Sequence, residues 1–436
     1  MPESRRIVIV GGGFAGTDLA RALRRQLPDG WEVLLFSREN HFVFTPLLAE
    51  VVGSAISPLH TVWPSREMAP STLCRTVPVV HLDPDAREVL YRGPVGETLR
   101  ERYDHLVIAC GLATDLGVVK GMGAHGWPLK GLGDAVVLRN HLIQQLERAE
   151  AEPDAKRRAQ LLSFAVVGGG FTGVELAGSL MDLFQDASRL YKRFSSEEVR
   201  VTLIDRGDRI LSPLPEGLSR YADRSLQGRG IDIRTRTRVQ EVRGDGLVLD
   251  RGEFVTAGTT ISAVGNTVQQ LVADTKLPLE RGRILVSPEM RVQGYDDVWA
   301  LGDCARVPNA WDGRDSPTLA QFAMRQATQL AENLVAVIAG RKPKPFQYHM
   351  QGMFAAIGHG KAVGNPFGVQ VSGLPAYLMW RAIYWAKMPS WVRKTQIAVD
   401  WGLDLFCPRD IVEISTIPTS REPTGGGQAT PGLPPM

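Results

Sequence analysis

The sequence predicts an α/β protein with two Rossmann-like dinucleotide-binding domains. Two segments support this prediction: residues 7–16 read IVIVGGGFAG and residues 164–173 read FAVVGGGFTG. Each is an apolar, strand-like run that breaks into G-x-G-x-x-G and continues as a helix-like run. The first glycine makes the tight turn, the second lets the backbone approach a pyrophosphate, and the third lets helix pack on strand. One copy is a weak signal, but two copies in this context indicate two nucleotide sites and electron transfer between two cofactors.

Composition narrows the class of protein. A chain of 436 residues can form two to three domains, and 44% hydrophobic with 22% charged residues is ordinary for a globular protein. A net charge of +3 gives no reason to expect a nucleic-acid partner. The cysteines show neither metal-ligand nor disulfide spacing, so we expect no metal site and a reducing compartment; they are Cys74, Cys110, Cys304 and Cys407.

The same sequence predicts how the protein meets a membrane. No apolar run approaches the roughly 18–20 residues that span a bilayer. The first strand begins near Ile7, which leaves no room for a signal peptide. We therefore expect a protein that is soluble or attached to one membrane face.

The remaining elements follow from hydrophobic periodicity and from breaker residues. The apolar, aromatic segment 40–48 is closed by Pro46 and predicts an ordered loop that enters a helix, and the charged segment 134–161 is helix-like. The other expected elements are strand 7–10, helix 14–27, strand 32–36, short strands within 77–91, buried strand 106–109, strand 164–167, helix 171–194, strand 199–204, strands within 231–264, buried strand 298–301 and helix 318–340.

Taken together, these segments resemble the type II NADH:quinone oxidoreductases, flavoproteins with two dinucleotide-binding domains. The likeness covers about residues 5–415 and keeps its order along the chain; it is carried by residues 11–16, 40–48, 103–111, 168–178, 284–305 and 317–326. The resemblance implies that an FAD domain is interrupted by an NAD domain and followed by a membrane-docking helical segment. The expected boundaries are 1–125 and 285–340 for FAD, 126–284 for NAD(P)H, 341–416 for docking, and 417–436 for a disordered tail.

The resemblance also implies the FAD site. Asp303 ends the predicted strand 298–301 and would hydrogen-bond the flavin's ribityl chain. The usual ribose carboxylate is missing, because strand 32–36 leads into Ser37; either Ser37 or Glu39 would bind the adenosine ribose. The full expected set of FAD contacts and neighbouring cofactor-binding residues is Gly11, Gly13, Phe14, Ala15, Gly16, Ser37, Arg38, Glu39, Thr45, Pro46, Ala109, Gly111, Gly265, Gly302, Asp303, Ala320 and Gln321.

The second fingerprint is expected to bind NADH. Asp205 ends the strand after it, where a carboxylate takes the adenosine ribose hydroxyls and repels a 2′-phosphate. Arg206 and Arg209 follow directly in the sequence, so the sequence does not exclude NADPH as the substrate. The separation between the fingerprint and Asp205 exceeds the usual ~20 residues, which we attribute to a longer helix and a charged loop at 192–198. The residues expected to contact NADH are Gly168, Gly170, Phe171, Gly173 and Asp205.

Three residues are expected to act in catalysis. Glu175 is a carboxylate in the first turn of an otherwise apolar helix, and the family places it beside the nicotinamide; alternatively it complements the helix dipole. Residues 320–326 read AQFAMRQ and match the family's A-Q-x-A-x-Q-Q helix except at Arg325. Gln321 would contact the flavin, and Arg325 would bind a quinone carbonyl or a more acidic acceptor.

Two other features have a competing structural explanation. Cys110 and Cys304 end apolar strands but are far apart in the sequence, so we read them as buried, inert thiols. The aromatic segment 377–388 predicts a helix lying in the membrane plane, with a dimer interface or a packed core helix as alternatives. The residues expected to face headgroups are Trp380, Trp385, Trp391, Trp401, Arg381, Lys387, Arg393 and Lys394.

The resulting hypothesis is a peripheral enzyme on the cytoplasmic face of the membrane, with FAD and NADH as cofactors. It would transfer a hydride from NADH to FAD and electrons to a membrane quinone, without pumping protons. The sequence does not decide whether the protein forms a homodimer. Two alternative functions are also compatible with it: a soluble reductase of the diaphorase kind, and a nucleotide-binding redox sensor with negligible turnover.

Overall fold

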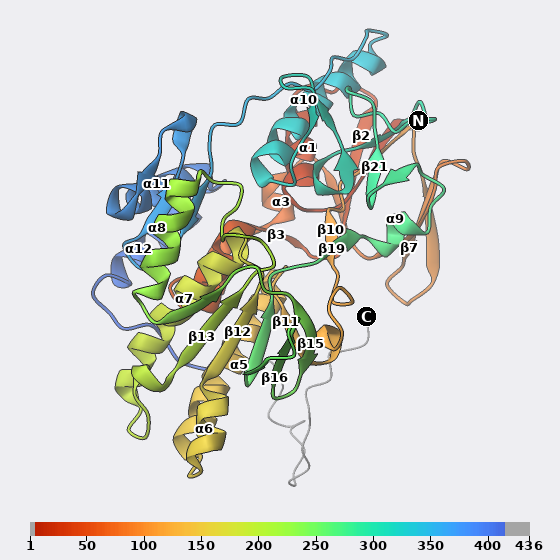
Figure 1. The fold of residues 1–436 in the computed structure, drawn as a ribbon. Helices are drawn as coiled ribbons and strands as arrows, with labels where there is room; N and C mark the ends of the chain where they lie inside the picture. Colours follow the sequence, from red (N-terminus) through yellow and green to blue (C-terminus); the bar gives the residue numbers. More distant parts are fainter. Residues whose placement is uncertain (1–4, 415–436) are drawn as a thin grey trace.

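The computed structural model describes residues 5–414, so the predicted tail at 417–436 lies outside the described residues. Two five-stranded sheets form its centre (Figure 1). The first sheet has the order β22-β9-β1-β2-β5, and all its neighbouring strands are parallel. Its strands are β1 (Arg5–Val10), β2 (Trp31–Ser37), β5 (Leu73–Thr76), β9 (His105–Ile108) and β22 (Val298–Ala300).

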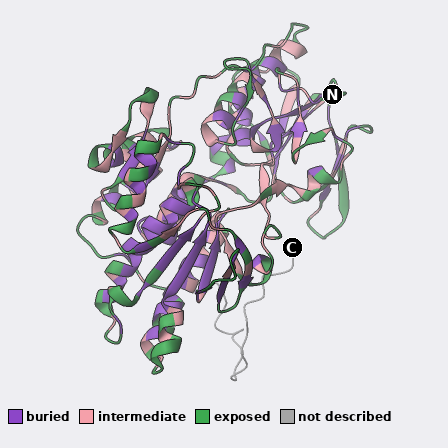
Figure 2. Ribbon diagram, viewed as in Figure 1, coloured by how far each residue is buried: buried purple, intermediate pink, exposed green. Residues whose placement is uncertain are grey.

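The second sheet is also fully parallel and has the order β11-β18-β12-β13-β14. Its central strands are buried, as Figure 2 shows, which is why they read as continuous apolar runs in the sequence. The two parallel sheets confirm the predicted α/β class with two Rossmann-like units. The strands are β11 (Gly126–Pro128), β12 (Ser163–Val167), β13 (Arg200–Ile204), β14 (Ile231–Arg234) and β18 (Thr259–Ser262).

Each sheet has its own apolar core. Helices α1 (Phe14–Leu23) and α10 (Ala320–Ile338) pack against each other and share a core with the first sheet. The second core contains α5 (Leu132–Ala151), α7 (Phe171–Ala187) and, from much earlier in the chain, α2 (Leu48–Val52). The division into domains at 125 and 284 stays a prediction.

The remaining elements are short and surround the two sheets. In chain order they are β3 (His41–Val43), η1 (Thr45–Leu47), η2 (Pro58–Thr61), β4 (Val62–Pro64), α3 (Ser65–Met68), β6 (Val79–Asp83), β7 (Glu88–Arg92), β8 (Thr98–Arg102), β10 (Leu112–Thr114), α4 (Met122–His125), α6 (Ala155–Leu161), η3 (Ser188–Leu190), η4 (Ser196–Glu198), α8 (Glu216–Gln227), β15 (Val239–Arg243), β16 (Gly246–Leu249), β17 (Phe254–Thr256), β19 (Asn266–Val268), α9 (Gln270–Ala273), β20 (Leu279–Glu280), β21 (Arg283–Leu285), η5 (Gly302–Cys304), β23 (Ala305–Arg306), β24 (Pro308–Asn309), β25 (Arg314–Asp315), β26 (Phe354–Ala356), β27 (Ala362–Gly364), η6 (Pro366–Gly368), β28 (Val371–Ser372), α11 (Gly373–Lys387) and α12 (Trp391–Leu403).

Three predicted boundaries are wrong. Helix 14–27 ends at Leu23, and helix 171–194 ends at Ala187. The helix-like stretch 134–161 is two helices, because Pro153 has no N–H and cannot continue α5. Asp154 then caps α6 by accepting a hydrogen bond of 2.8 Å from the backbone N–H of Arg157. The predicted loop at 40–48 contains the short strand β3 before it turns into α2.

The C-terminal helices bury part of the surface that we expected to face lipid. Trp380 of α11 is 1% exposed and Trp401 of α12 is 6% exposed. The guanidinium of Arg381 lies over the rings of Tyr377 and Trp401, at 4.5 and 5.0 Å from their centroids. The prediction that these three residues face headgroups is therefore wrong. The aromatic face of α11 packs on the protein, and an aromatic helix face suits a protein core as well as a membrane interface.

A buried arginine attaches the C-terminal segment to the second core. The Arg409 guanidinium donates to the carbonyl oxygens of Gly53 and Ser179, at 2.9 and 3.0 Å. It also pairs with the carboxylates of Asp182 and Asp404, at 3.2 and 3.3 Å. These contacts join α7, the turn after α2, and the end of α12.

Replacing Arg409 with Met should lower the free energy of unfolding by about 1.5–3 kcal/mol, because the two buried carboxylates and two backbone carbonyls lose a charged donor. Arg229 still pairs with Asp182, and Arg381 still pairs with Asp404. Chemical denaturation followed by tryptophan fluorescence measures this change. The exposed Arg341 provides the control, and Arg341→Met should have little effect. A loss below about 1 kcal/mol, the size of a surface ion pair, would contradict the assignment of Arg409 as the attachment point.

Candidate functional site

The first fingerprint forms a turn that only glycine can make. Gly11 has φ +121°, and a Cβ at that position would lie 2.3 Å from the carbonyl oxygen of Ala109. A Cβ at Gly16 would lie 1.9 Å from the oxygen of Gly11, so helix α1 approaches the turn closely. By contrast, a Cβ at Gly13 would meet nothing within 4 Å. The turn is thus closed by protein on one side and open on the other, at the N-terminus of a helix, as a pyrophosphate requires.

Asp303 lies beside this turn, at the end of β22. Among residues 5–414, no group donates a hydrogen bond to its carboxylate, so its oxygens are available to hydroxyl donors. Burial raises the pKa of Asp303, and the charges of Lys130 and Arg283 oppose that shift. A partly covered carboxylate without a protein donor suits the polyol chain of a flavin, so the residues present fit FAD.

Gln326 positions the turn that carries Asp303, and the sequence prediction missed it. This buried side chain of α10 accepts a hydrogen bond of 2.8 Å from the N–H of Gly302, which has φ +73°. A Cβ at Gly302 would lie 3.1 Å from the Cβ of Ala15, so the turn packs directly on α1. The final glutamine of the A-Q-x-A-x-Q-Q motif was the available signal.

At the adenosine end of the predicted FAD site, the structure separates the two candidate ligands. Ser37 lies against the fingerprint, since a Cβ at Gly12 would approach its hydroxyl to 2.4 Å. Glu39 is exposed. This arrangement favours Ser37 as the ribose contact, and that role stays a prediction.

The second fingerprint repeats the geometry of the first. Gly168 has φ +118°, and a Cβ at that position would approach Val264 Cγ1 to 2.6 Å. A Cβ at Gly173 would lie 1.8 Å from the oxygen of Gly168, whereas Gly170 again faces open space. The predicted Gly265 has φ +84° in the turn after β18, close to the backbone of Asp115.

Asp205 is held in place by backbone donors at the end of β13. Its carboxylate oxygens each accept one hydrogen bond of 2.6 Å, from the N–H groups of Gly169 and Gly207. The guanidinium of Arg209 donates to the carbonyl oxygens of Leu214 and Ser212, at 2.9 and 2.8 Å, so it is already engaged. Arg206 is exposed. Of the two cations because of which NADPH was not excluded, Arg206 is therefore the one that the protein leaves exposed.

Glu175 points away from solvent and toward the C-terminal region. Its Oε1 accepts a hydrogen bond of 3.2 Å from the N–H of Ala356 in β26. Burial raises the pKa of Glu175 to about 8; the hydrogen bond from Ala356 opposes the shift and the charge of Glu50 adds to it. Glu175, Glu50 and Pro46 line one small cavity. Glu175 is the fifth residue of α7, so the expectation that it lies in the first turn is wrong; whether it complements the helix dipole stays a prediction.

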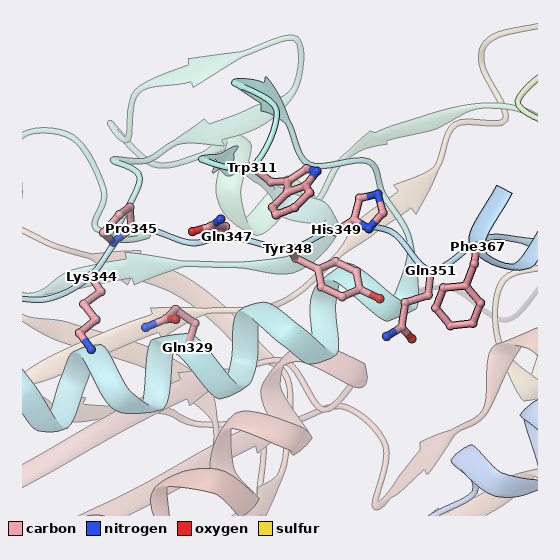
Figure 3. A pocket seen from close by; sticks show the side chains of 9 residues that line it. All are labelled: Trp311, Gln329, Lys344, Pro345, Gln347, Tyr348, His349, Gln351 and Phe367. Atoms are coloured by element: carbon pink, nitrogen blue, oxygen red, sulfur yellow. The ribbon is translucent and has the colours of Figure 1, made fainter.

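Gln321 and Arg325 lie on a different side of the site, facing the extended linker that leaves α10. Gln321 accepts a hydrogen bond of 3.2 Å from the hydroxyl of Tyr348 and donates one of 3.3 Å to the oxygen of Gly352. The Arg325 guanidinium lies 5.6 Å from the centroid of the Tyr348 ring. Figure 3 shows Tyr348 over α10, beside an open cavity of about 690 Å³. In the described part of the chain, no direct contact joins this pair to Glu175.

The two cysteines near the first fingerprint are neighbours in space. Their thiols interact, which raises the pKa of Cys110 and lowers that of Cys304. The Cys304 thiol donates to the carbonyl oxygens of Leu301 and Ile108, at 3.3 and 3.5 Å, and the Cys110 thiol to that of Gly111, at 3.8 Å. Both remain free thiols. Cys304 is buried, as predicted, whereas Cys110 is only partly buried, and parallel pairing of β9 with β22 brings the two strand ends together.

Comparison with known proteins is consistent with this arrangement. Residues 5–327 match the pyridine nucleotide-disulphide oxidoreductase family, and residues 350–410 match the NDH2 C-terminal domain. The chain belongs to the type II NADH:quinone oxidoreductases. It is 31% identical to a demethylphylloquinone reductase of Synechocystis, covering 92% of this chain and 96% of that protein. It is 29% identical to the type II NADH:quinone oxidoreductase of Mycobacterium tuberculosis, covering 94% and 89%.

A solved structure of the family shares the fold. NDH2 from Plasmodium falciparum, in complex with NADH, superposes with a TM-score of 0.88 at 18% identity and covers 94% of this chain and 100% of that chain. Within residues 5–414, no helix is long and apolar enough to cross a membrane. In the same range, no group of three or more His, Cys, Asp or Glu residues is arranged to hold a metal ion.

Replacing Asp303 with Ala should weaken FAD binding about 10- to 100-fold, because a charged hydrogen-bond acceptor contributes about 1.5–3 kcal/mol. The amount of flavin per protein after dialysis measures this loss. NADH affinity of the flavin-loaded fraction should change much less. Asp296, whose side chain is 97% exposed before β22, is the control, and Asp296→Ala should keep full flavin content. Equal flavin content in both variants would contradict the role of Asp303.

Replacing Asp205 with Asn should narrow the preference for NADH over NADPH by about tenfold, because it removes the charge that repels a 2′-phosphate while keeping an acceptor oxygen. Arg206→Ala should widen the same preference. The ratio of kcat/KM for the two nucleotides measures both effects. A wild-type protein that prefers NADPH would show that Arg206 outweighs the carboxylate.

Proposed function

We propose that this protein oxidises NADH and reduces a membrane quinone, without moving protons across the membrane. One observation carries the proposal: Glu175, from the helix that follows the second fingerprint, meets the C-terminal region in a cavity also lined by Pro46. Pro46 belongs to η1, in the segment that is predicted to lie against the flavin. The two nucleotide sites and the C-terminal region therefore converge at one place. When bound, FAD supplies the two-electron chemistry between NADH and the acceptor.

The residues of the chain would bind and orient the two nucleotides. The open sides of Gly13 and Gly170 would each receive a pyrophosphate at a helix N-terminus. Asp303, presented by the turn that Gln326 holds, would accept hydrogen bonds from the flavin's polyol chain. Asp205 would accept hydrogen bonds from the ribose of NADH.

Glu175 would supply a proton at the acceptor end. With a pKa of about 8, its carboxyl group holds a proton at pH 7 and can release one when an acceptor becomes more basic. Gln321 and Arg325 would bind the polar end of the acceptor from the α10 side. The overall reaction balances as NADH plus one proton plus quinone, giving NAD⁺ and quinol.

A surface formed by α11 and α12 supports attachment to a membrane face. We call it the docking surface; it consists of exposed apolar side chains that a monomeric soluble protein rarely gathers in one region. Lys394 lies at its edge, 5.0 Å from the ring of Trp391, where a cation can meet anionic headgroups. We propose the cytoplasmic face as its location, and a homodimer stays a prediction. The docking surface comprises Leu374, Leu378, Met379, Trp391, Val392, Val399 and Leu403.

Replacing Leu378 and Val392 together with Glu should release the protein from vesicles, because each apolar side chain contributes about 1.5–3 kcal/mol when it leaves water. Flotation with vesicles of anionic phospholipid measures binding. NADH oxidation should fall at least about tenfold with a long-tailed quinone in these vesicles. It should be unchanged with ferricyanide, a water-soluble acceptor that takes electrons alone.

Val95 is the matched control, because it is 90% exposed in the hairpin between β7 and β8, far along the chain from α11. Val95→Glu should bind vesicles and reduce quinone like the wild type. If the wild type itself does not float with vesicles, a soluble reductase replaces this proposal. If the wild type binds FAD and NADH but oxidises no NADH with any acceptor, the redox-sensor alternative replaces this proposal.

A further inference from the structure

A small internal cavity connects Glu175 with other titratable groups, among them Asp182, Tyr377 and Arg409. Glu50 of α2 and His359, which follows β26, line the same cavity as Glu175. It offers about 20 Å³ to the centre of a water molecule, which is room for about one water. Its walls are polar enough to hold that water, since the side chains of Glu175, Glu50 and His359 can each donate or accept a hydrogen bond.

Glu50 was not among the site residues that we predicted from the sequence. Its Oε2 accepts a hydrogen bond of 2.8 Å from the indole N–H of Trp401. Burial raises the pKa of Glu50 to about 7, and the negative charge of Asp404 adds to the shift. Arg381, the Trp401 hydrogen bond and Arg409 oppose it. The carboxyl of Glu50 therefore changes its protonation state near neutral pH.

His359 connects the cavity with solvent. Its side chain is 43% exposed, and its Nδ1 lies 3.3 Å from Oδ2 of Asp404. The hydrogen bond to Asp404 raises the pKa of His359, while Arg381 and burial oppose that shift. The backbone N–H of His359 donates to Asp182, at 2.9 Å, so the position of the ring is fixed from two sides. A half-exposed imidazole whose pKa is raised thus lies at the solvent side of the cavity.

A purely structural role for Glu50 is the competing explanation. Its hydrogen bond with Trp401 would hold α12 against α2 whether or not Glu50 ever exchanges a proton. A Gln side chain can still accept from the indole N–H, but it cannot carry a proton at neutral pH. The substitution of Glu50 by Gln therefore separates the two roles.

We propose that Glu50 and His359 form a proton relay that resupplies Glu175 from solvent through the water-sized cavity. This inference rests on the proposed function: the hydride of NADH brings two electrons and one proton, so forming the quinol consumes one further proton from solvent. In the relay, His359 takes a proton from bulk water and Glu50 passes it across the cavity to the Glu175 carboxylate. Glu50 is thus a positioning residue that acts through Glu175.

The test uses the full-length, flavin-loaded protein in vesicles, with Glu50→Gln and His359→Gln as variants. Glu67→Gln, an exposed glutamate of α3, is the control. At about pH 6, where the wild-type Glu50 and Glu175 carboxyls are both protonated, Glu50→Gln should reduce the long-tailed quinone about tenfold more slowly, the lower end of what a proton-transfer group contributes because water can partly replace it. Ferricyanide reduction, which consumes no proton at the acceptor, should stay within about twofold. Glu50→Asp should restore most of the quinone rate.

The pH profile gives a second readout. Both carboxyl pKa values are raised, so each group is protonated below its pKa and loses its proton as pH increases. The wild-type quinone rate should therefore fall between about pH 7 and pH 8, and the step near pH 7 should disappear in Glu50→Gln. An infrared titration, which needs no turnover, should show one protonated carboxyl fewer at about pH 6 in that variant.

Three outcomes would overturn the relay. Glu50→Gln could keep the wild-type quinone rate and pH profile, or it could slow ferricyanide and quinone equally, or its infrared titration could match that of the wild type. Failure of the proposed function looks different, because then the wild type itself reduces no quinone. In that case the infrared titration alone still decides whether Glu50 exchanges a proton near neutral pH.

Discussion

The pairing of β22 with β9 determines where the functional parts of this chain lie. Val298 and Ala300 pair in parallel with Leu106 and Ile108, which inserts a late segment next to the first strands of the chain. Asp303 consequently lies beside the first fingerprint, and α10 continues across α1. The linker after α10 then leads to the C-terminal region. Without this one pairing, the first fingerprint would still form its turn. It would lack Asp303, the packing of α10 and the connection to the C-terminal region.

Local patterns predicted the fold and the nucleotide turns well, because these depend on neighbouring residues. A strand, a G-x-G-x-x-G turn and a helix follow one another within about 30 residues, and Asp303 directly follows its own buried strand. Glu50, by contrast, meets Trp401, and Cys110 meets Cys304. These contacts join residues that are far apart in the sequence, and no hydrophobic periodicity along the sequence indicates them. The inward side of α11 was mistaken for a related reason: Tyr377, Trp380 and Tyr384 share one face at the spacing i, i+3, i+7, and such a face can pack on protein or on lipid.

The acidic cavity shows how the protein tolerates buried carboxyl groups. Burying two carboxylates together would be expensive if both were charged, and raised pKa values allow them to be neutral instead. The nearby Asp182 and Asp404 are instead stabilised by a cation, because Arg409 pairs with both carboxylates. One region thus contains fixed ion pairs and protonatable acids side by side. The ion pairs hold the C-terminal helices in place, and the neutral acids remain free to exchange protons.

Helix α2 has a consequence for the evolution and engineering of this fold. It comes from the first fifth of the chain, yet Leu48, Val51 and Val52 are buried in the core of the second sheet. An excised segment 126–284 would lack these side chains and would present the vacated apolar patch to water. Such a fragment is a poor unit for recombination. Chimeras that exchange the nicotinamide-binding half should therefore carry α2 with it, or replace these three residues with apolar ones that fit the core of the new partner.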